Sequence, residues 1–211
     1  QDSVNTLNDF IQSIKLVMRL HGLTLLIMKG YNSRVNPVRT KISRYLYSKG
    51  QLCKNFSLKF RTMEKSNDIT GQIRIISTGQ ESKLEELYQE GSLKVLAPKT
   101  YGLSKELILI NTSGGVLGGD KYNVAIDLKK NSKLIMSSQA AERVYKSRGE
   151  ISAIKMRANL SGKSSLIWIP YETILFNESS MARSFDINIS KGSSAIFFDH
   201  IVFGRIASGE V

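Results

Sequence analysis

Asn111-Thr-Ser-Gly-Gly-Val-Leu-Gly-Gly-Asp120 is the stretch of this chain on which the prediction of its fold depends. It follows an apolar run, Leu107 to Ile110, and precedes an alternating run in which Val124, Ile126 and Leu128 are apolar. Glycine reaches backbone conformations with positive φ that other residues rarely adopt, and it allows another segment to approach closely. Four glycines so close together therefore predict a tight loop between two strands, ending on the carboxylate of Asp120.

From Gly71 onward, apolar residues recur with a period of two. The alternating runs are Ile73 and Ile75; Leu93 and Val95; Val124, Ile126 and Leu128; Ile154, Met156, Ala158 and Leu160; and Phe185, Ile187 and Ile189. Turn-forming residues separate the runs at Lys130–Ser132, Ser147–Gly149, Ser161–Lys163, Asn177–Ser179 and Lys191–Ser193. Short strands at a spacing of about ten residues predict an all-β sandwich or stacked-sheet fold. Because the turns are short, we expect mostly antiparallel sheets.

The first 62 residues differ from the rest of the chain. Apolar residues at helical spacing predict an amphipathic helix from about Val4 to Leu20, and Arg39 to Tyr47 are expected to form a short basic helix. The segment is rich in Lys and Arg and poor in acids, as transit peptides are. We therefore interpret residues 1–62 as a basic, helical or disordered extension and residues 63–211 as the β domain.

The net charge of +12 comes mostly from this extension. Residues 1–62 hold 11 Lys and Arg against 2 Asp and Glu, whereas residues 63–211 hold 19 against 16. A basic segment can bind nucleic acid or an anionic surface, but no recognition motif accompanies the charge, so specific nucleic-acid binding is not expected. The single Cys53 excludes an internal disulfide framework and favours a cytoplasmic location. Charged residues interrupt the apolar stretch from Phe10 to Met28, so no membrane span is predicted.

The sequence does not favour an enzyme. The glycine-rich loop lacks the Gly-Lys-Ser/Thr ending of a P-loop, and alternating strands and helices, which a dinucleotide site needs, are missing. The only histidines are His21, in the extension, and His200, in an apolar run, so a nucleophile paired with a histidine base is not expected. One Cys and two widely spaced His cannot form a closed metal site.

Transient passage of a hydrated divalent cation does not need a closed metal site. It needs carboxylates and carbonyl groups that line a water-filled path and bind the ion weakly. The carboxylates that could serve are Asp120, Glu142, Glu172 and Asp199. Each also has a structural interpretation. Asp120 can accept hydrogen bonds in its own turn, Glu142 and Arg143 can pair with neighbours, and Glu172 can pair with Arg183 or Arg205.

Five strings, in this order, resemble the UreD (UreH) family of urease accessory proteins. They are Tyr88–Val95, Asn111–Asp120, Gln139–Arg143, Ile169–Phe176, and Val202–Arg205 followed by Gly209-Glu210. The resemblance covers about two thirds of the chain, from Gly71 to the last residue. It implies an elongated stack of β-sheets with a few helices.

The resemblance further implies a scaffold that is not a catalyst. Such a protein binds urease apoprotein and a UreF-like accessory protein, recruits a UreG-like GTPase through UreF, and helps to insert nickel into urease. No tightly bound cofactor is implied, only transient nickel(II) in a channel. The family motifs add loop and interface residues to the four carboxylates: Gly114, Gly115, Gly118, Gly119, Ser138, Gln139, Arg143, Arg183 and Arg205.

The chain departs from the family at its end. It stops at Val211, where members of the family ordinarily continue with further strands, so we expect a C-terminally truncated domain. Two alternatives follow for the function. One is a basic β-rich module that binds nucleic acid or anionic surfaces through residues 1–62, and the other is a nonfunctional remnant of a UreD-like protein.

Overall fold

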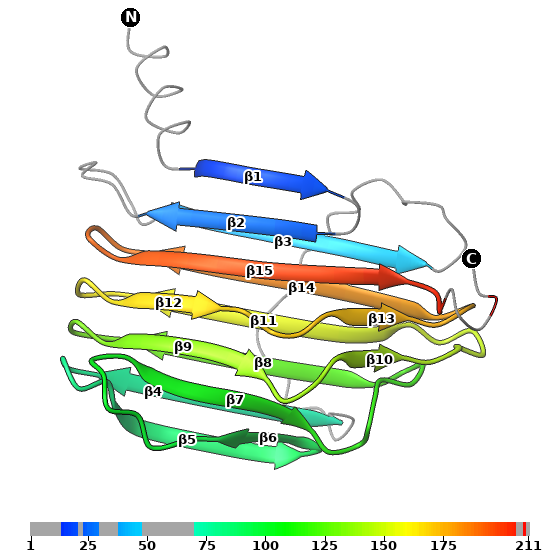
Figure 1. Cartoon of the computed structure of the whole chain (residues 1–211), viewed down its shortest axis with the longest axis horizontal. Coiled ribbons are helices and arrows are strands. Elements are labelled where there is room, and N and C mark those ends of the chain that lie inside the picture. Colours follow the sequence, from blue (N-terminus) through cyan, green and yellow to red (C-terminus); the bar gives the residue numbers. More distant parts are fainter. Residues whose placement is uncertain (1–13, 21–22, 30–37, 48–69, 206–208, 210–211) are drawn as a thin grey trace, which may run out of the picture.

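The computed structural model describes residues 14–20, 23–29, 38–47, 70–205 and 209, and before residue 70 it describes the backbone alone. Its regular elements are all β-strands (Figure 1). Among these residues there is no helix, and hence none long and apolar enough to span a membrane. The strands are β1 (Ile14–Leu20), β2 (Leu23–Lys29), β3 (Val38–Tyr47), β4 (Gly71–Thr78), β5 (Lys83–Gly91), β6 (Leu93–Leu96), β7 (Lys105–Asn111), β8 (Lys121–Leu128), β9 (Lys133–Ser138), β10 (Glu142–Val144), β11 (Ser152–Leu160), β12 (Ser165–Trp168), β13 (Thr173–Leu175), β14 (Ser180–Ile189) and β15 (Ser194–Phe203).

The strands form two sheets that stack face to face (Figure 1). The first sheet has the order β1-β2-β15-β12-β9-β7-β6, and the short strands β10 and β13 extend it through the pairing of β13 with β15. The second sheet has the order β3-β14-β11-β8-β4-β5. All the turns predicted between Lys130 and Ser193 lie between strands. The expectation of an all-β stack of sheets is confirmed.

The centre of each sheet is parallel, so the prediction of mostly antiparallel sheets is wrong there. The chain passes from the second sheet to the first at each short turn, from β8 to β9, from β11 to β12 and from β14 to β15. With each passage, every sheet gains one strand that lies beside the previous strand of the same sheet and runs in the same direction. Neighbouring strands at the centre of each sheet are therefore parallel. Antiparallel pairs occur in β4–β5, β6–β7 and the pairs made by β1, β2 and β3. The short turns after β8, β11 and β14 thus reverse the chain between the sheets, whereas the short turn from β4 to β5 reverses it within one sheet.

The segment before residue 48 contributes strands instead of the two predicted helices. Residues 14–20 of the first predicted helix form β1, and its residues 4–13 lie outside the described residues. The second predicted helix is strand β3, which pairs with β14, while β2 pairs with β15. Valine, threonine, isoleucine and tyrosine in Val38–Tyr47 favour a strand over a helix. The division of the chain at residue 62 stays a prediction.

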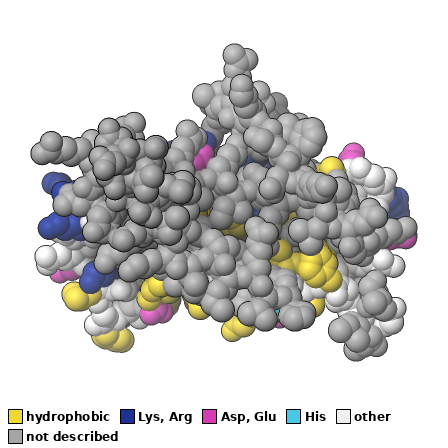
Figure 2. Space-filling view, turned by 90° about the horizontal axis from the view of Figure 1, so that it is seen from above, with side chains coloured by type: hydrophobic (Ala, Val, Ile, Leu, Met, Phe, Trp, Pro, Cys, Tyr) yellow, Lys and Arg dark blue, Asp and Glu magenta, His cyan; other side chains and the backbone are white. Residues whose placement is uncertain are grey.

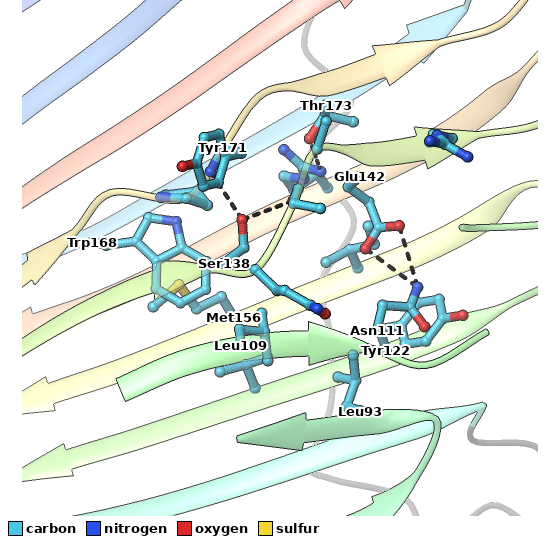
Figure 3. A pocket seen from close by; sticks show the side chains of 18 of the residues that line it. Leu93, Leu109, Asn111, Tyr122, Ser138, Glu142, Met156, Trp168, Tyr171 and Thr173 are labelled. Atoms are coloured by element: carbon cyan, nitrogen blue, oxygen red, sulfur yellow. Dashed lines mark hydrogen bonds between the residues drawn. The ribbon is translucent and has the colours of Figure 1, made fainter. Parts of the chain in front are cut away.

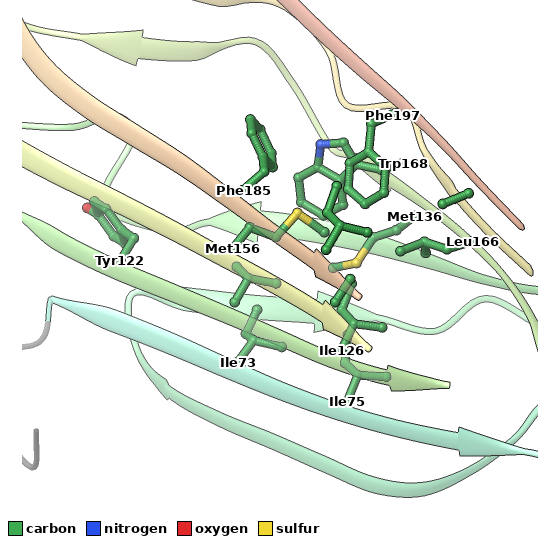
Figure 4. Packing of buried hydrophobic residues seen from close by; sticks show 14 of the residues in the cluster. Ile73, Ile75, Tyr122, Ile126, Met136, Met156, Leu166, Trp168, Phe185 and Phe197 are labelled. Atoms are coloured by element: carbon green, nitrogen blue, oxygen red, sulfur yellow. The ribbon is translucent and has the colours of Figure 1, made fainter. Parts of the chain in front are cut away.

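The apolar positions predicted by the period of two fill the space between the sheets (Figure 4). Ile73, Ile75 and Ile126 on the second sheet are at most 2% exposed, as are Met136 and Leu166 on the first. Successive side chains of a strand point to opposite faces, so each strand buries one set of residues and exposes the other. Burying these side chains, at about 1.5–3 kcal/mol each, holds the two sheets together.

Candidate functional site

A cavity of about 310 Å³ has walls from both sheets (Figure 3). Apolar side chains form much of its lining: Leu93, Leu109, Val124, Ile154, Met156, Trp168 and Phe185. Polar side chains line it as well: Asn111, Tyr122, Ser138, Gln139, Glu142, Arg143, Thr173 and Arg183. The cavity lies where β7 and β9 end and β10 and β13 begin, so the loop motifs of the sequence meet there.

Several of the residues predicted for the site line this cavity, and others do not. The lining includes Gly114, Ser138, Gln139, Glu142, Arg143 and Arg183. The residues that lie outside the lining are Gly115, Gly118, Gly119, Asp120, Glu172, Asp199 and Arg205. Of the four carboxylates predicted from the sequence, only Glu142 borders the cavity, although β10, which carries it, is only three residues long.

Glu142 is fixed by its backbone and by its carboxylate. Its N–H donates to the carbonyl oxygen of Glu172 at 2.9 Å, which joins β10 to the segment before β13. The Asn111 amide nitrogen donates to both carboxylate oxygens, at 3.2 and 3.3 Å. Burial raises the pKa of the Glu142 carboxyl, because the charged form loses water; the Asn111 hydrogen bond and the Arg183 charge oppose this but do not cancel it.

Asp199 is a partner of Arg183. The Arg183 guanidinium donates from Nη1 to Asp199 Oδ1 at 2.6 Å and from Nη2 to Thr173 Oγ1 at 2.8 Å. Both side chains of the ion pair are almost fully buried, at 10% and 8% exposure. A buried pair of this kind satisfies each charge with the other. Of the two partners considered for Glu172, Arg183 or Arg205, Arg183 instead forms its ion pair with Asp199, between β14 and β15.

Asp120 closes the glycine-rich loop. Its Oδ2 accepts hydrogen bonds from the Leu117 N–H at 2.8 Å and from the Tyr122 hydroxyl at 3.1 Å. Its Oδ1 accepts from the Thr70 hydroxyl at 3.2 Å. These contacts hold the end of the loop to the start of β8 and to the residue before β4.

The glycines of the loop allow it to lie against the segment from Arg143 to Glu150. Val116 donates to the Arg143 carbonyl at 2.7 Å and accepts from the Tyr145 N–H at 2.9 Å, beside β10. A side chain at Gly115 would collide with the Tyr145 ring and lie 2.8 Å from the Arg143 carbonyl oxygen. Gly119 has φ of 86°, and any side chain there would meet the Glu150 carboxylate. The loop therefore positions β10, and β10 carries Glu142.

The remaining predicted residues support the surrounding loops. The Ser138 hydroxyl donates to the Ala140 carbonyl at 3.0 Å and accepts from the Tyr171 N–H at 2.9 Å (Figure 3). The Gln139 backbone N–H donates to the Leu109 carbonyl at 2.9 Å. The Arg205 guanidinium lies 4.0 Å from the centre of the Phe176 ring, a cation–π distance.

Asn111, Tyr122 and Thr173 belong to the site but were not singled out from the sequence. Asn111 opens the stretch from which the fold was predicted, yet only the structure places its amide beside Glu142. Among the residues that the structure describes, no three His, Cys, Asp or Glu side chains group in a way that could hold a metal ion. The one carboxylate in the lining, with amide, hydroxyl and carbonyl groups near it, offers weak oxygen ligands.

The chain matches known proteins along the same region. A family model described as UreD urease accessory protein matches residues 70–211. A protein of Brucella anthropi named urease accessory protein UreD 1 is 40% identical over 129 residues, which are 61% of this chain and 46% of that protein. UreD of Brucella suis is 37% identical and UreD of a Chelativorans species 36% identical, each over 141 residues, 67% of this chain and 50% and 51% of those proteins.

The chain thus spans about half the length of the curated relatives it matches. The matched region holds the glycine-rich loop, β10 and every residue that lines the cavity. The chain belongs to the UreD family of urease accessory proteins.

Proposed function

We propose that this chain acts in the cytoplasm as a scaffold of urease maturation, not as a catalyst. It binds urease apoprotein on one side and a UreF-like accessory protein on the other, and a UreG-like GTPase joins through the UreF-like protein. Nickel(II) is the cargo, and it passes through the cavity between the sheets. The observation that carries this proposal is the convergence of four of the five family motifs on one cavity, whose described lining holds one carboxylate, that of Glu142.

The lining of the cavity suits passage better than storage. Nickel that is held tightly in proteins favours imidazole or thiolate ligands, and the part of the lining that the structure describes contains neither His nor Cys. One carboxylate, with carbonyl and amide groups near it, would bind the ion weakly and leave most of its bound water molecules in place. Apolar walls formed by Leu109, Met156 and Trp168 would leave the ion few other places to bind.

The outer face of the first sheet supports the binding of a protein partner. Ile135, Ile167 and Ile196 lie in register on β9, β12 and β15. Their neighbours Met136, Leu166 and Phe197 are buried, so the three isoleucines face outward. Seen from above, hydrophobic side chains also reach the described part of the surface, with Lys and Arg at both ends (Figure 2). Apolar surface of this kind marks protein–protein interfaces.

Co-purification tests the scaffold role. The full chain is expressed with the UreF-like protein and urease subunits of its own organism, in a strain that lacks its UreD-type protein, and urease activity is followed with added nickel. We expect the UreF-like protein and the urease subunits to co-purify with the chain and urease to become active. A soluble chain that neither binds these partners nor supports activation contradicts the proposal. Activation would also exclude a nonfunctional remnant.

A further inference from the structure

Three oxygen atoms converge on one nitrogen at the wall of the cavity. The Asn111 amide nitrogen, Nδ2, donates to the two Glu142 carboxylate oxygens at 3.2 and 3.3 Å (Figure 3). It also donates to the Gly115 carbonyl oxygen at 3.1 Å. The hydrogens of an amide carry partial positive charge, and these oxygens are all acceptors. The amide nitrogen therefore occupies the position that a small oxygen-binding cation would take between the same three atoms.

The other end of the Asn111 side chain is held in place. Its oxygen, Oδ1, accepts from the Ser113 N–H at 3.1 Å and from the Ser113 hydroxyl at 2.6 Å. An ionised carboxylate can only accept hydrogen bonds, so the NH₂ group of the amide, and not its oxygen, must face Glu142. The amide is thus built into the glycine-rich loop and aimed at the carboxylate.

We propose that Asn111 competes with the divalent cation for the Glu142 carboxylate and the Gly115 carbonyl. This inference rests on the proposed function, since it concerns the ion that passes the same cavity. While the amide donates to these oxygens, a cation can bind them only by displacing it, which lowers the affinity and speeds release. Asn111 is then a positioning residue that keeps the oxygen site weak enough for transfer.

The substitution Asn111→Asp tests this competition. Aspartate keeps the oxygen that accepts from Ser113, but it replaces the competing NH₂ group with a second carboxylate beside Glu142. Cation affinity rises with the number of charged oxygen ligands. Calorimetric titration of the full-length chain with Ni²⁺ alone should show binding on the order of tenfold tighter in N111D than in the wild type.

Two further variants complete the experiment. Asn131→Asp makes the same chemical change in an exposed turn at the other end of β8, and Ni²⁺ affinity should stay that of the wild type. Asn111→Ala removes the competitor without adding a ligand, and Ni²⁺ should bind roughly twofold to tenfold more tightly, the equivalent of one hydrogen bond. Because N111A also loses the contacts to Ser113, its folding is checked by thermal unfolding, and N111D decides the result if N111A is unfolded.

The variants separate failure of this inference from failure of the proposed passage. If E142Q loses Ni²⁺ binding while N111D binds as the wild type does, Glu142 meets the ion but Asn111 does not compete, and the inference is overturned. Weaker Ni²⁺ binding in a folded N111A would overturn it as well. If E142Q binds Ni²⁺ as the wild type does, the passage past Glu142 fails, and the role of Asn111 fails with it.

Discussion

At the scale of the single residue, Glu142 is the predicted carboxylate that borders the cavity. Burial raises the pKa of its carboxyl above the ordinary value of 4.5, against the hydrogen bond from Asn111 and the positive charge of Arg183. Asp199, by contrast, binds the Arg183 guanidinium at 2.6 Å. The two carboxylates therefore differ in role, because one has a full positive partner and the other has an amide.

This difference predicts a pH-dependent stability. A carboxyl whose pKa is raised in the folded state stabilises the fold below its unfolded pKa, and this contribution is lost as the pH rises through the folded pKa. Urea unfolding of E142Q and the wild type, between pH 4.5 and pH 7.5, should therefore show that E142Q gains stability relative to the wild type as the pH rises. Glu81→Gln, in an exposed turn, should show no such trend. A difference that is flat, or that shrinks with pH, contradicts the burial of Glu142.

Among the elements, the glycine-rich loop and β10 act as one unit. The loop bonds to one edge of β10 through Val116, which bridges Val144 by hydrogen bonds to Arg143 and Tyr145, and Asn111 at its start binds the Glu142 side chain. A strand of only three residues makes few ladder hydrogen bonds, so its position depends on this loop and on β13. The loop is therefore part of the cavity wall.

Replacing Gly115 with alanine should disturb this unit. The added carbon would collide with the Tyr145 ring and lie 2.8 Å from the Arg143 carbonyl oxygen, at φ of 155°, which is unfavourable for alanine. We expect a loss of about 1–3 kcal/mol in the free energy of unfolding, measured in urea. In Gly102→Ala the added carbon would meet only the Ser104 backbone nitrogen, at an ordinary contact distance of 4.0 Å, and the free energy of unfolding should change by less than about 0.5 kcal/mol. Equal effects of the two substitutions would show that the loop is not packed as described.

The strands after residue 70 follow from the period of two, but their order in the sheets does not. A further signal was present in the sequence, since Ser132-Lys-Leu134, Ser164-Ser-Leu166 and Ser193-Ser-Ala195 recur at the start of β9, β12 and β15. Such repeats indicate that strands stack in parallel. The helix expected from Arg39 to Tyr47 was wrong because its basic residues hid the alternation of a strand.

The cavity could not be predicted from local sequence patterns, because it is formed by contacts between residues that are far apart in the sequence. Asn111 and Glu142 are 31 residues apart, and they meet because the loop after β7 bonds to β10. The motifs indicated which loops matter, while the stacking of the sheets decided that Glu142 borders the cavity and that Asp120 and Asp199 do not. The sequence therefore indicated this region and included Glu142 among four candidate carboxylates, but it did not indicate the amide that binds Glu142, and a role of Glu142 toward nickel stays a prediction.

In the molecule as a whole, the proposed function assigns different roles to two regions. The space between the sheets holds the core and the cavity, and the outer face of the first sheet carries the row of Ile135, Ile167 and Ile196. A scaffold that passes an ion needs both, a partner surface outside and a path inside. Binding of nucleic acid or anionic surfaces by the basic residues 1–62 stays a prediction, and a steep dependence of binding on salt would indicate it.

The nickel content of urease is the most direct test of the claim that nickel passes Glu142. Urease is purified from cells that express the wild-type chain, E142Q or E81Q with the same partners, and co-purification is followed in the same preparations. We predict that E142Q binds its partners as the wild type does but yields urease with much less nickel, whereas E81Q matches the wild type. Urease with full nickel content from the E142Q cells would contradict the passage of nickel past this carboxylate.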